Sequence, residues 1–325
     1  MALGGVTLLV TVFTAVYHAE VIAHRVGEPF GTLVLALAVT VIEAALIVSV
    51  MLADPAGNAA LARDTVFSAV MIVCNGIVGA CLLLGGARYH EQHFHLQGAT
   101  AALAVLTVIT GLTMVLPNVT NTPGPQFSTP QLIFAAVISL ALYCSYIFVQ
   151  AVRHRDYFLP VSTKDEDAHS APPSAKATFL SVFLLLVSLV AIVGLAKMLT
   201  PAIEAGIEHL GVPRAVVGIV IAALVLLPEG LAAVRAAHAD RLQTSLNLAL
   251  GSVLATIGLT IPAVAAVSIA IDQPIQLGLD PKGVTLLALT LLLSVITLGT
   301  SRTTVLQGIV HLVLFADFLF FAIVP

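Results

Sequence analysis

Long apolar stretches alternate with short polar connections along almost the whole chain. Each stretch has about 20 residues, the length that a helix needs to cross a bilayer core at a rise of 1.5 Å per residue. Backbone polar groups find no water inside lipid, so we expect these stretches to be helices. The pattern predicts ten membrane-spanning helices, over residues 4–24, 31–52, 64–86, 98–116, 131–151, 177–199, 215–236, 244–271, 283–300 and 303–324.

One polar segment interrupts this pattern. Residues 153–176, RHRDYFLPVSTKDEDAHSAPPSAK, are charged and contain several Pro and Ser residues, which is typical of a loop or linker. The segment divides the chain into residues 1–152 and 177–325, each with five predicted helices. Because each half has an odd number of spans, the second half enters the membrane from the opposite side. We therefore predict an all-α membrane protein of about ten helices in two inverted five-helix repeats.

Composition agrees with a multi-spanning membrane protein. The 325 residues are 59% hydrophobic and only 9% charged, and the mean hydropathy is +1.08. A soluble protein of this size would need far more polar surface.

The basic residues predict the orientation in the membrane. Loops after odd-numbered spans carry nine of the 13 lysines and arginines, and the other four follow even-numbered spans. The positive-inside rule therefore places the odd-span loops, including the 153–176 linker, in the cytoplasm and both termini outside. An outside N-terminus behind so short a leader is unusual, and it raises the expectation of an additional first helix. The nine residues are Arg25, Arg88, Arg153, Arg155, Lys164, Lys176, Arg235, Arg241 and Arg302.

Two glutamates lie deep inside predicted spans, at matching places in the two halves. Glu43 interrupts the second span and Glu229 interrupts the seventh. They lie about 18 Å and 21 Å into a core of about 30 Å, on helices that run in opposite directions. An ionisable group in hydrocarbon costs roughly 2.5 kcal/mol or more, so such a residue by default marks an ion or proton pathway. A structural salt bridge is the alternative, but no Lys or Arg lies centrally in any span.

Two facing carboxylates would form a site for a hard cation such as Ca²⁺. A buried carboxyl group also holds a proton, so that cation and proton compete for one site. Competition at one site is the minimum mechanism of antiport. Thr40 lies one helical turn before Glu43, and Pro228 frees a backbone carbonyl near Leu224.

Polar side chains on two neighbouring spans extend the candidate site. Asn247, Ser252, Thr256 and Thr260 recur at helical spacing on the eighth span. They either line a cavity or permit tight helix packing. On the third span, Asn75 is the best single candidate. The predicted cation- and proton-binding residues are Glu43, Glu229, Thr40, Asn75, Asn247 and Ser252, with the two glutamates as the metal ligands.

Long sequence motifs resemble a known family. HAEVIAHRVGEPFGTLVLALAVTVIEAALI (residues 18–47), RDTVFSAVMIV (63–73), LLPEGLAAVRAA (226–237) and LNLALGSVLATIGLTIP (246–262) closely resemble bacterial calcium/proton antiporters of the ChaA type. This type belongs to the cation/calcium exchanger superfamily, and the resemblance spans nearly the whole chain. It implies inverted repeats, an acidic signature helix in each, and coupled exchange of Ca²⁺ or Na⁺ for H⁺ across a bacterial inner membrane. The family's leading helix has no counterpart here.

The superfamily signature usually reads Gly-Asn-x-x-Glu. Residues 39–43 read Val-Thr-Val-Ile-Glu and residues 225–229 read Val-Leu-Leu-Pro-Glu. The acids match and the asparagines do not, which leaves fewer side-chain oxygens and opens the choice among Ca²⁺, Na⁺ and K⁺.

The sequence therefore predicts a secondary-active antiporter that exports Ca²⁺, with Na⁺ or K⁺ as further candidates, in exchange for protons by alternating access. The alternatives are a monovalent Na⁺(K⁺)/H⁺ antiporter without Ca²⁺ transport and a passive cation channel. An enzyme is not expected, because the spans lack paired Asp, Ser/His or His-Glu-x-x-His arrangements. The expected partners are the lipid bilayer, the transported cations and protons. We expect no cofactor and no nucleic acid, and the oligomeric state stays open.

Overall fold

Each of the ten predicted spans is helical in the computed structural model, which describes residues 2–27, 30–53, 57–159, 173–211 and 213–324. Within these residues, nine helices are long and apolar enough to cross a membrane, and Ala36–Leu52 of α2 is a shorter apolar helix. The first half contains α1 (Ala2–Val26), α2 (Phe30–Ala53), α3 (Leu61–Met71), η1 (Ile72–Ile77), α4 (Val78–Tyr89), α5 (Leu96–Thr110), η2 (Gly111–Val115), η3 (Leu116–Val119), α6 (Thr129–Phe148), η4 (Val149–Arg153) and η5 (Arg155–Phe158).

The second half repeats this plan. It contains α7 (Ala175–Leu210), α8 (Ala215–His238), α9 (Leu242–Ala255), η6 (Thr256–Thr260), α10 (Ile261–Ala270), α11 (Pro281–Leu298) and α12 (Val305–Ile323). The strands β1 (Gln92–His93) and β2 (Arg302–Thr303) form one short antiparallel pair between two loops. Apart from this pair the fold is all-α, as predicted.

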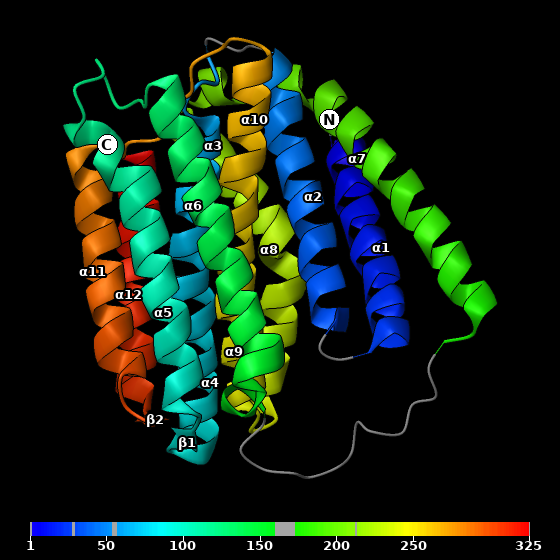
Figure 1. Cartoon of the computed structure of the whole chain (residues 1–325), viewed down its shortest axis with the longest axis vertical. Helices are drawn as coiled ribbons and strands as arrows, with labels where there is room; N and C mark the ends of the chain where they lie inside the picture. Colours follow the sequence, from blue (N-terminus) through cyan, green and yellow to red (C-terminus); the bar gives the residue numbers. More distant parts are fainter. Residues whose placement is uncertain (1, 28–29, 54–56, 160–172, 212, 325) are drawn as a thin grey trace.

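Successive spans run in opposite directions, and both chain ends lie at the same end of the bundle (Figure 1). The spans α2 and α8, which carry the two glutamates, are therefore antiparallel. The next span of each half has the same length of 29 residues, Leu61–Tyr89 and Leu242–Ala270. Each contains a π-helical turn near its middle, η1 and η6. This correspondence agrees with two inverted five-helix repeats; the exact limits 1–152 and 177–325 stay a prediction.

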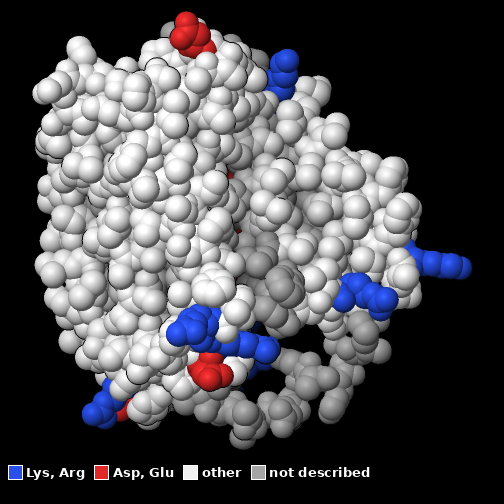
Figure 2. Space-filling view, in the orientation of Figure 1, with Lys and Arg blue, Asp and Glu red and all other residues white. Residues whose placement is uncertain are grey.

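The flank of the bundle is apolar and its two ends carry the charges. Figure 2 shows lysine, arginine and acidic side chains mostly toward the ends and lower flank of the visible face, with a white expanse between. Large apolar side chains of the outer helices are highly exposed, including Phe179 at 78% and Val190 at 74% on α7. Such a surface is unfavourable in water and matches the hydrocarbon of a bilayer.

The site-bearing spans lie inside the bundle and pack closely. The helix α2 contacts α8, α9 and η6, and α8 packs against α3, α4 and α9. A β-carbon at Gly218 of α8 would come within 2.7 Å of the backbone between Asp64 and Thr65 of α3. Only glycine permits this approach, because backbone atoms cannot move aside. The helices α1, α2 and α7 pack against one another at one side of the bundle, where an apolar cluster joins them to α8 (Figure 1).

The predicted linker is partly folded. Its first residues form the short helix η5, whose Phe158 is buried, and α7 already begins at Ala175. The expectation of a loop throughout 153–176 was therefore wrong at its ends, because Phe158 has apolar neighbours to cover it, among them Tyr146. Lys164 and the rest of 160–172 lie outside the described residues.

Candidate functional site

The two glutamates occupy the middle of antiparallel helices inside the bundle. Glu43 of α2 is only 2% exposed. Glu229 of α8 is partly exposed, yet its Oε2 atom is buried. Neither Glu43 Oε1 nor Glu229 Oε2 has a hydrogen-bond partner among the described residues. The helices α2 and α8 that carry these two side chains pack against each other. Buried, unpartnered acid oxygens are costly, so their placement indicates a ligand or a proton.

A hydroxyl from the second half contacts the acid of the first half. Thr256, the first residue of η6, donates its hydroxyl to Glu43 Oε2 over 2.8 Å. Thr260 lies one turn further along and its buried hydroxyl has no hydrogen-bond partner. The π-helical geometry of η6 widens the helix at this point, and π turns often occur at functional sites. Two hydroxyls of one turn are thus available beside Glu43.

Two of the predicted residues fit beside this pair. Thr40 is buried on α2 and donates its hydroxyl to the Ala36 carbonyl over 2.8 Å, which leaves its oxygen able to accept or to coordinate. Ser252 is half-buried and precedes Thr256 by one helical turn, so both lie on the same face of their span.

Asn247 lies elsewhere, at the end of the bundle near the linker. Its amide nitrogen donates to the Phe158 carbonyl over 2.6 Å, and its oxygen accepts from Gln243 over 2.9 Å. It stands nine residues before Thr256, or about 13 Å along the helix axis. The role of Asn247 in cation binding stays a prediction; in the structure its amide holds η5 against α9.

Asn75 also has other partners. Its amide nitrogen donates to Thr290 of α11 over 2.8 Å, and its oxygen lies 3.1 Å from Nδ1 of His311 on α12. Both polar atoms of the side chain are therefore engaged with the outer helices. Thr40 and Ser252 lie one helical turn from Glu43 and Thr256 respectively, whereas Asn75 belongs to a different cluster.

Sequence reasoning missed His311 and left Glu20 outside the predicted cation site. Glu20 of α1 is exposed, and its charge acts on both Glu229 and Arg235. It lies six residues before the end of α1, whose last turn contains His24 and Arg25. His311 is fully buried. The signal was present in both cases, since each is an ionisable residue within a predicted span.

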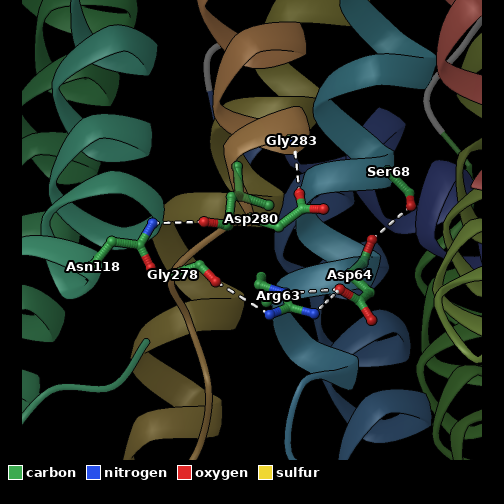
Figure 3. A network of polar contacts seen from close by, with 8 residues as sticks. Arg63, Asp64, Ser68, Asn118, Gly278, Asp280 and Gly283 are labelled. Carbon is green, nitrogen blue, oxygen red and sulfur yellow. Dashed lines mark hydrogen bonds and ion pairs between the residues drawn. The ribbon is translucent and has the colours of Figure 1, made fainter. Parts of the chain in front are cut away.

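A second polar cluster lies at the bundle end that carries the chain termini (Figure 3). Arg63 contacts Asp64 at 2.8 Å and donates to the Gly278 carbonyl over 3.1 Å. Asp280 caps α11 by accepting from the Gly283 amide over 2.7 Å. Arg63, Asp64, Asp280 and Gly283 border a cavity of ≈ 130 Å³. The charges of this cluster already have partners, so it closes the bundle end and is a poorer cation site than the two glutamates.

The acid pair can bind either a cation or protons. Among the described residues, no group of three or more His, Cys, Asp or Glu side chains forms a metal cluster. The remaining ligands of a cation would thus be hydroxyl, backbone and water oxygens, which suit hard ions such as Ca²⁺, Na⁺ and K⁺.

Membrane-length helices with an apolar flank and a buried, unpartnered acid pair define the class of the protein: a multi-spanning membrane transporter for cations. The particular family follows from comparison with known proteins. The chain belongs to the sodium/calcium exchanger protein family, whose sequence profile matches residues 1–152 and 180–324. It is a transporter and not an enzyme, and the resemblance to ChaA-type proteins is confirmed.

The similarity extends over nearly the whole chain. A protein of Sinorhizobium fredii named as ionic transporter y4hA is 50% identical over 97% of this chain and 86% of its own length. The sodium-potassium/proton antiporter ChaA of Escherichia coli is 36% identical over 96% of this chain and 85% of its own length. The solved structure of native YfkE has a TM-score of 0.78 at 16% identity, covers 100% of this chain and 92% of its own, and shows the same fold.

Proposed function

We propose that this chain exchanges a cation for protons by alternating access at Glu43 and Glu229, in the plasma membrane of a bacterium. One observation carries the proposal: two acids on helices that pack against each other, one from each half, have buried oxygens without partners among the described residues. Each such oxygen is stabilised either by a proton or by a bound cation, and the two occupants exclude each other. The inward proton gradient then drives cation export.

The immediate ligands would come from both halves. Glu43 and Glu229 supply the charges, and Thr256, Thr40 and Ser252 stand close by to supply neutral oxygens. Because α2 and α8 belong to opposite repeats, a rocking motion of one repeat against the other would open the pair first to one side and then to the other.

Charge balance favours Ca²⁺ as the cation. Two ionised carboxylates carry two negative charges, which one divalent cation neutralises, and two protons neutralise the same pair. Exchange of one Ca²⁺ for two protons would therefore leave the buried site neutral in both loaded states, which avoids the cost of an unpaired charge in a low-dielectric interior.

Monovalent exchange is the second candidate. The relative with 36% identity is named a sodium-potassium/proton antiporter, and the site here has few side-chain oxygens beyond the two acids. A Na⁺ or K⁺ ion needs less charge compensation than Ca²⁺, so one ionised acid with hydroxyl and carbonyl oxygens would suffice.

Proton flux in sealed proteoliposomes tests the proposal. Vesicles holding a pH dye are challenged in turn with Ca²⁺, Na⁺ and K⁺, and proton movement is followed together with cation uptake. The proposal expects protons to move opposite to at least one cation, and the cation that gives the largest flux identifies the substrate. Cation uptake with no proton movement would instead establish a passive channel and overturn the proposal.

The first prediction concerns the acids. Glu43→Gln and Glu229→Gln keep the side-chain volume but remove the charge, so each variant should reduce coupled exchange to the level of protein-free vesicles. The same flux assay measures this loss, and circular dichroism checks that the helices are retained. Glu91→Gln is the matched control, because Glu91 lies on an exposed loop 3.5 Å from Arg302 and should leave exchange unchanged. Normal exchange by either core variant would contradict the assigned site.

A further inference from the structure

Another polar cluster, distinct from that of Figure 3, is enclosed between η1, α11 and α12. Asn75, Thr290 and His311 are 0% exposed, and Thr297 is 1% exposed. His311 is the one ionisable member of this cluster and has no part in the cation site described above. Burial of so many polar groups is costly unless their hydrogen bonds are complete.

The donor and the acceptor of each hydrogen bond in this cluster can be assigned from the chemistry of the groups. The Thr290 hydroxyl lies 3.3 Å from the Met71 sulfur, which only accepts, so the hydroxyl donates there and its oxygen accepts from the Asn75 amide nitrogen at 2.8 Å. The Asn75 oxygen then faces His311 Nδ1 at 3.1 Å, and because an amide oxygen only accepts, Nδ1 carries the hydrogen.

The other ring nitrogen completes the chain of hydrogen bonds. In a neutral imidazole with hydrogen on Nδ1, Nε2 is an acceptor. The Thr297 hydroxyl lies 3.2 Å from it and donates. Every polar group from Thr297 through His311 and Asn75 to Thr290 therefore has a partner of the correct kind, and one tautomer of His311 is selected.

Close packing of the backbones of α4 and α12 holds His311 in place. A β-carbon at Gly79 of α4 would come within 3.0 Å of the His311 β-carbon and 3.2 Å of the Gly308 carbonyl oxygen. A β-carbon at Gly308 would overlap the backbone nitrogen of Leu83. The helices α4 and α12 thus touch through backbone atoms, which leaves the imidazole little freedom to move.

The opposite side of η1 reaches the cation site. Ile77 of η1 packs against Gly230 of α8, where a β-carbon would lie 3.0 Å from the Ile77 Cδ1 atom. Gly230 directly follows Glu229. The π-helical turn is therefore fixed by Asn75 on one side and supports the acid-bearing helix on the other.

We propose that His311 is a positioning residue for cation exchange. Its Nδ1–H holds Asn75, and with it η1, where Ile77 supports α8 and keeps Glu229 opposite Glu43. This inference rests on the proposed function of the acid pair and adds a residue outside the cation site that determines its geometry.

Two amide substitutions separate the two nitrogens of the ring. Asparagine at 311 places an amide where Nδ1 stands and can still donate to Asn75, whereas glutamine reaches the place of Nε2 and the Thr297 hydroxyl instead. We expect His311→Gln to raise the half-saturating cation concentration about tenfold, equivalent to about 1.4 kcal/mol. For His311→Asn the half-saturating cation concentration should stay within about twofold of the wild-type value. This variant keeps the hydrogen bond to Asn75, and the loss of one such bond would account for the tenfold change.

The assay is proton-coupled flux in proteoliposomes, with the thermal unfolding midpoint of each variant measured in detergent. His93→Asn is the matched control, because His93 is exposed on β1 and should change neither quantity. A larger increase in the half-saturating cation concentration for His311→Gln than for His311→Asn supports the positioning role. Equal half-saturating concentrations for both variants, or equal losses of maximal rate with lowered unfolding midpoints, would overturn it and leave His311 as a packing residue. Failure of the wild type to exchange at all would count against the proposed function itself.

Discussion

At the scale of single residues, the decisive contact joins the two halves of the chain. The Thr256 hydroxyl donates to Glu43 Oε2 over 2.8 Å, while the other oxygen of Glu43 stays unpartnered. A hydrogen bond to an ionised acceptor contributes about 1.5–3 kcal/mol in a buried setting. It stabilises the ionised acid, which is the form that binds a cation. Thr256 should therefore tune the competition between cation and proton.

Substitution of Thr256 tests this role. Thr256→Val keeps the shape of the side chain but removes the hydroxyl, so we expect the half-saturating cation concentration to rise about tenfold or more. Thr256→Ser restores the donor and should recover most of the affinity. Concentration series in the vesicle flux assay measure both. Thr107→Val is the control, since Thr107 is exposed and bonds only the Leu103 carbonyl of its own helix. Equal affinities for the valine and serine variants would contradict the role.

The polar residues also show what the sequence pattern could predict. Asn247 and Thr256 share one predicted stripe, yet only Thr256 contacts an acid. Helical spacing shows which residues share a face, and it does not show how far along that face a ligand lies or what other partners compete. Asn247 is close to η5, so its amide pairs with that backbone instead.

At the scale of elements, two of the π-helical turns lie at the middle of the central spans, whereas η2 and η4 follow α5 and α6. Both η1 and η6 lie near the middle of 29-residue spans and contact the acid-bearing helices. A π turn contains an extra residue relative to an α-helix, so side chains beyond it are rotated by about 100°. This rotation determines which side chains of each span face the acids. It cannot be predicted from the hydropathy pattern.

The stability of the protein should depend on the close contact between α4 and α12. Gly308→Ala introduces a β-carbon against backbone atoms of Leu83 and Gly79, which cannot yield without separating the two helices. We expect a loss of about 1–3 kcal/mol in the free energy of unfolding, as for other overpacked sites. Thermal and denaturant unfolding in detergent measure this loss. Gly194→Ala on α7 is the control, because a β-carbon there meets nothing within 4 Å. Similar stability of both variants would show that the contact is not tight.

At the scale of the whole molecule, the arrangement of charges predicts how the bundle sits in the membrane. The loops after α1, α4, α8 and α11 gather at one end together with the two ends of the linker, and the chain termini lie at the other (Figure 1). Most basic residues belong to the first group, including Arg88, Arg153 and Arg302. The positive-inside rule therefore places that end in the cytoplasm and the chain termini outside.

Single-cysteine labelling tests this orientation. In a background with Cys74, Cys81 and Cys144 replaced, Gln273→Cys should react in intact cells with a membrane-impermeant maleimide. His154→Cys should react only after the membrane is opened, because it lies at the opposite end. Both positions are exposed in the structure, so access depends on the membrane alone. The reverse pattern of labelling would invert the predicted topology.

The sequence by itself determined that the chain consists of about ten apolar helices, that their directions alternate, and which two acids are buried in them. The physical reason is that lipid excludes unpaired backbone groups and penalises charge so strongly that each span and each intramembrane acid is visible along the chain. Only the tertiary structure decided that Thr256 donates a hydrogen bond to Glu43. It likewise decided that Asn75 bonds to His311 and that Asn247 bonds to the Phe158 carbonyl. The rotation of each helix about its axis depends on its neighbours and on the π turns, and these arise from packing between segments far apart in the chain.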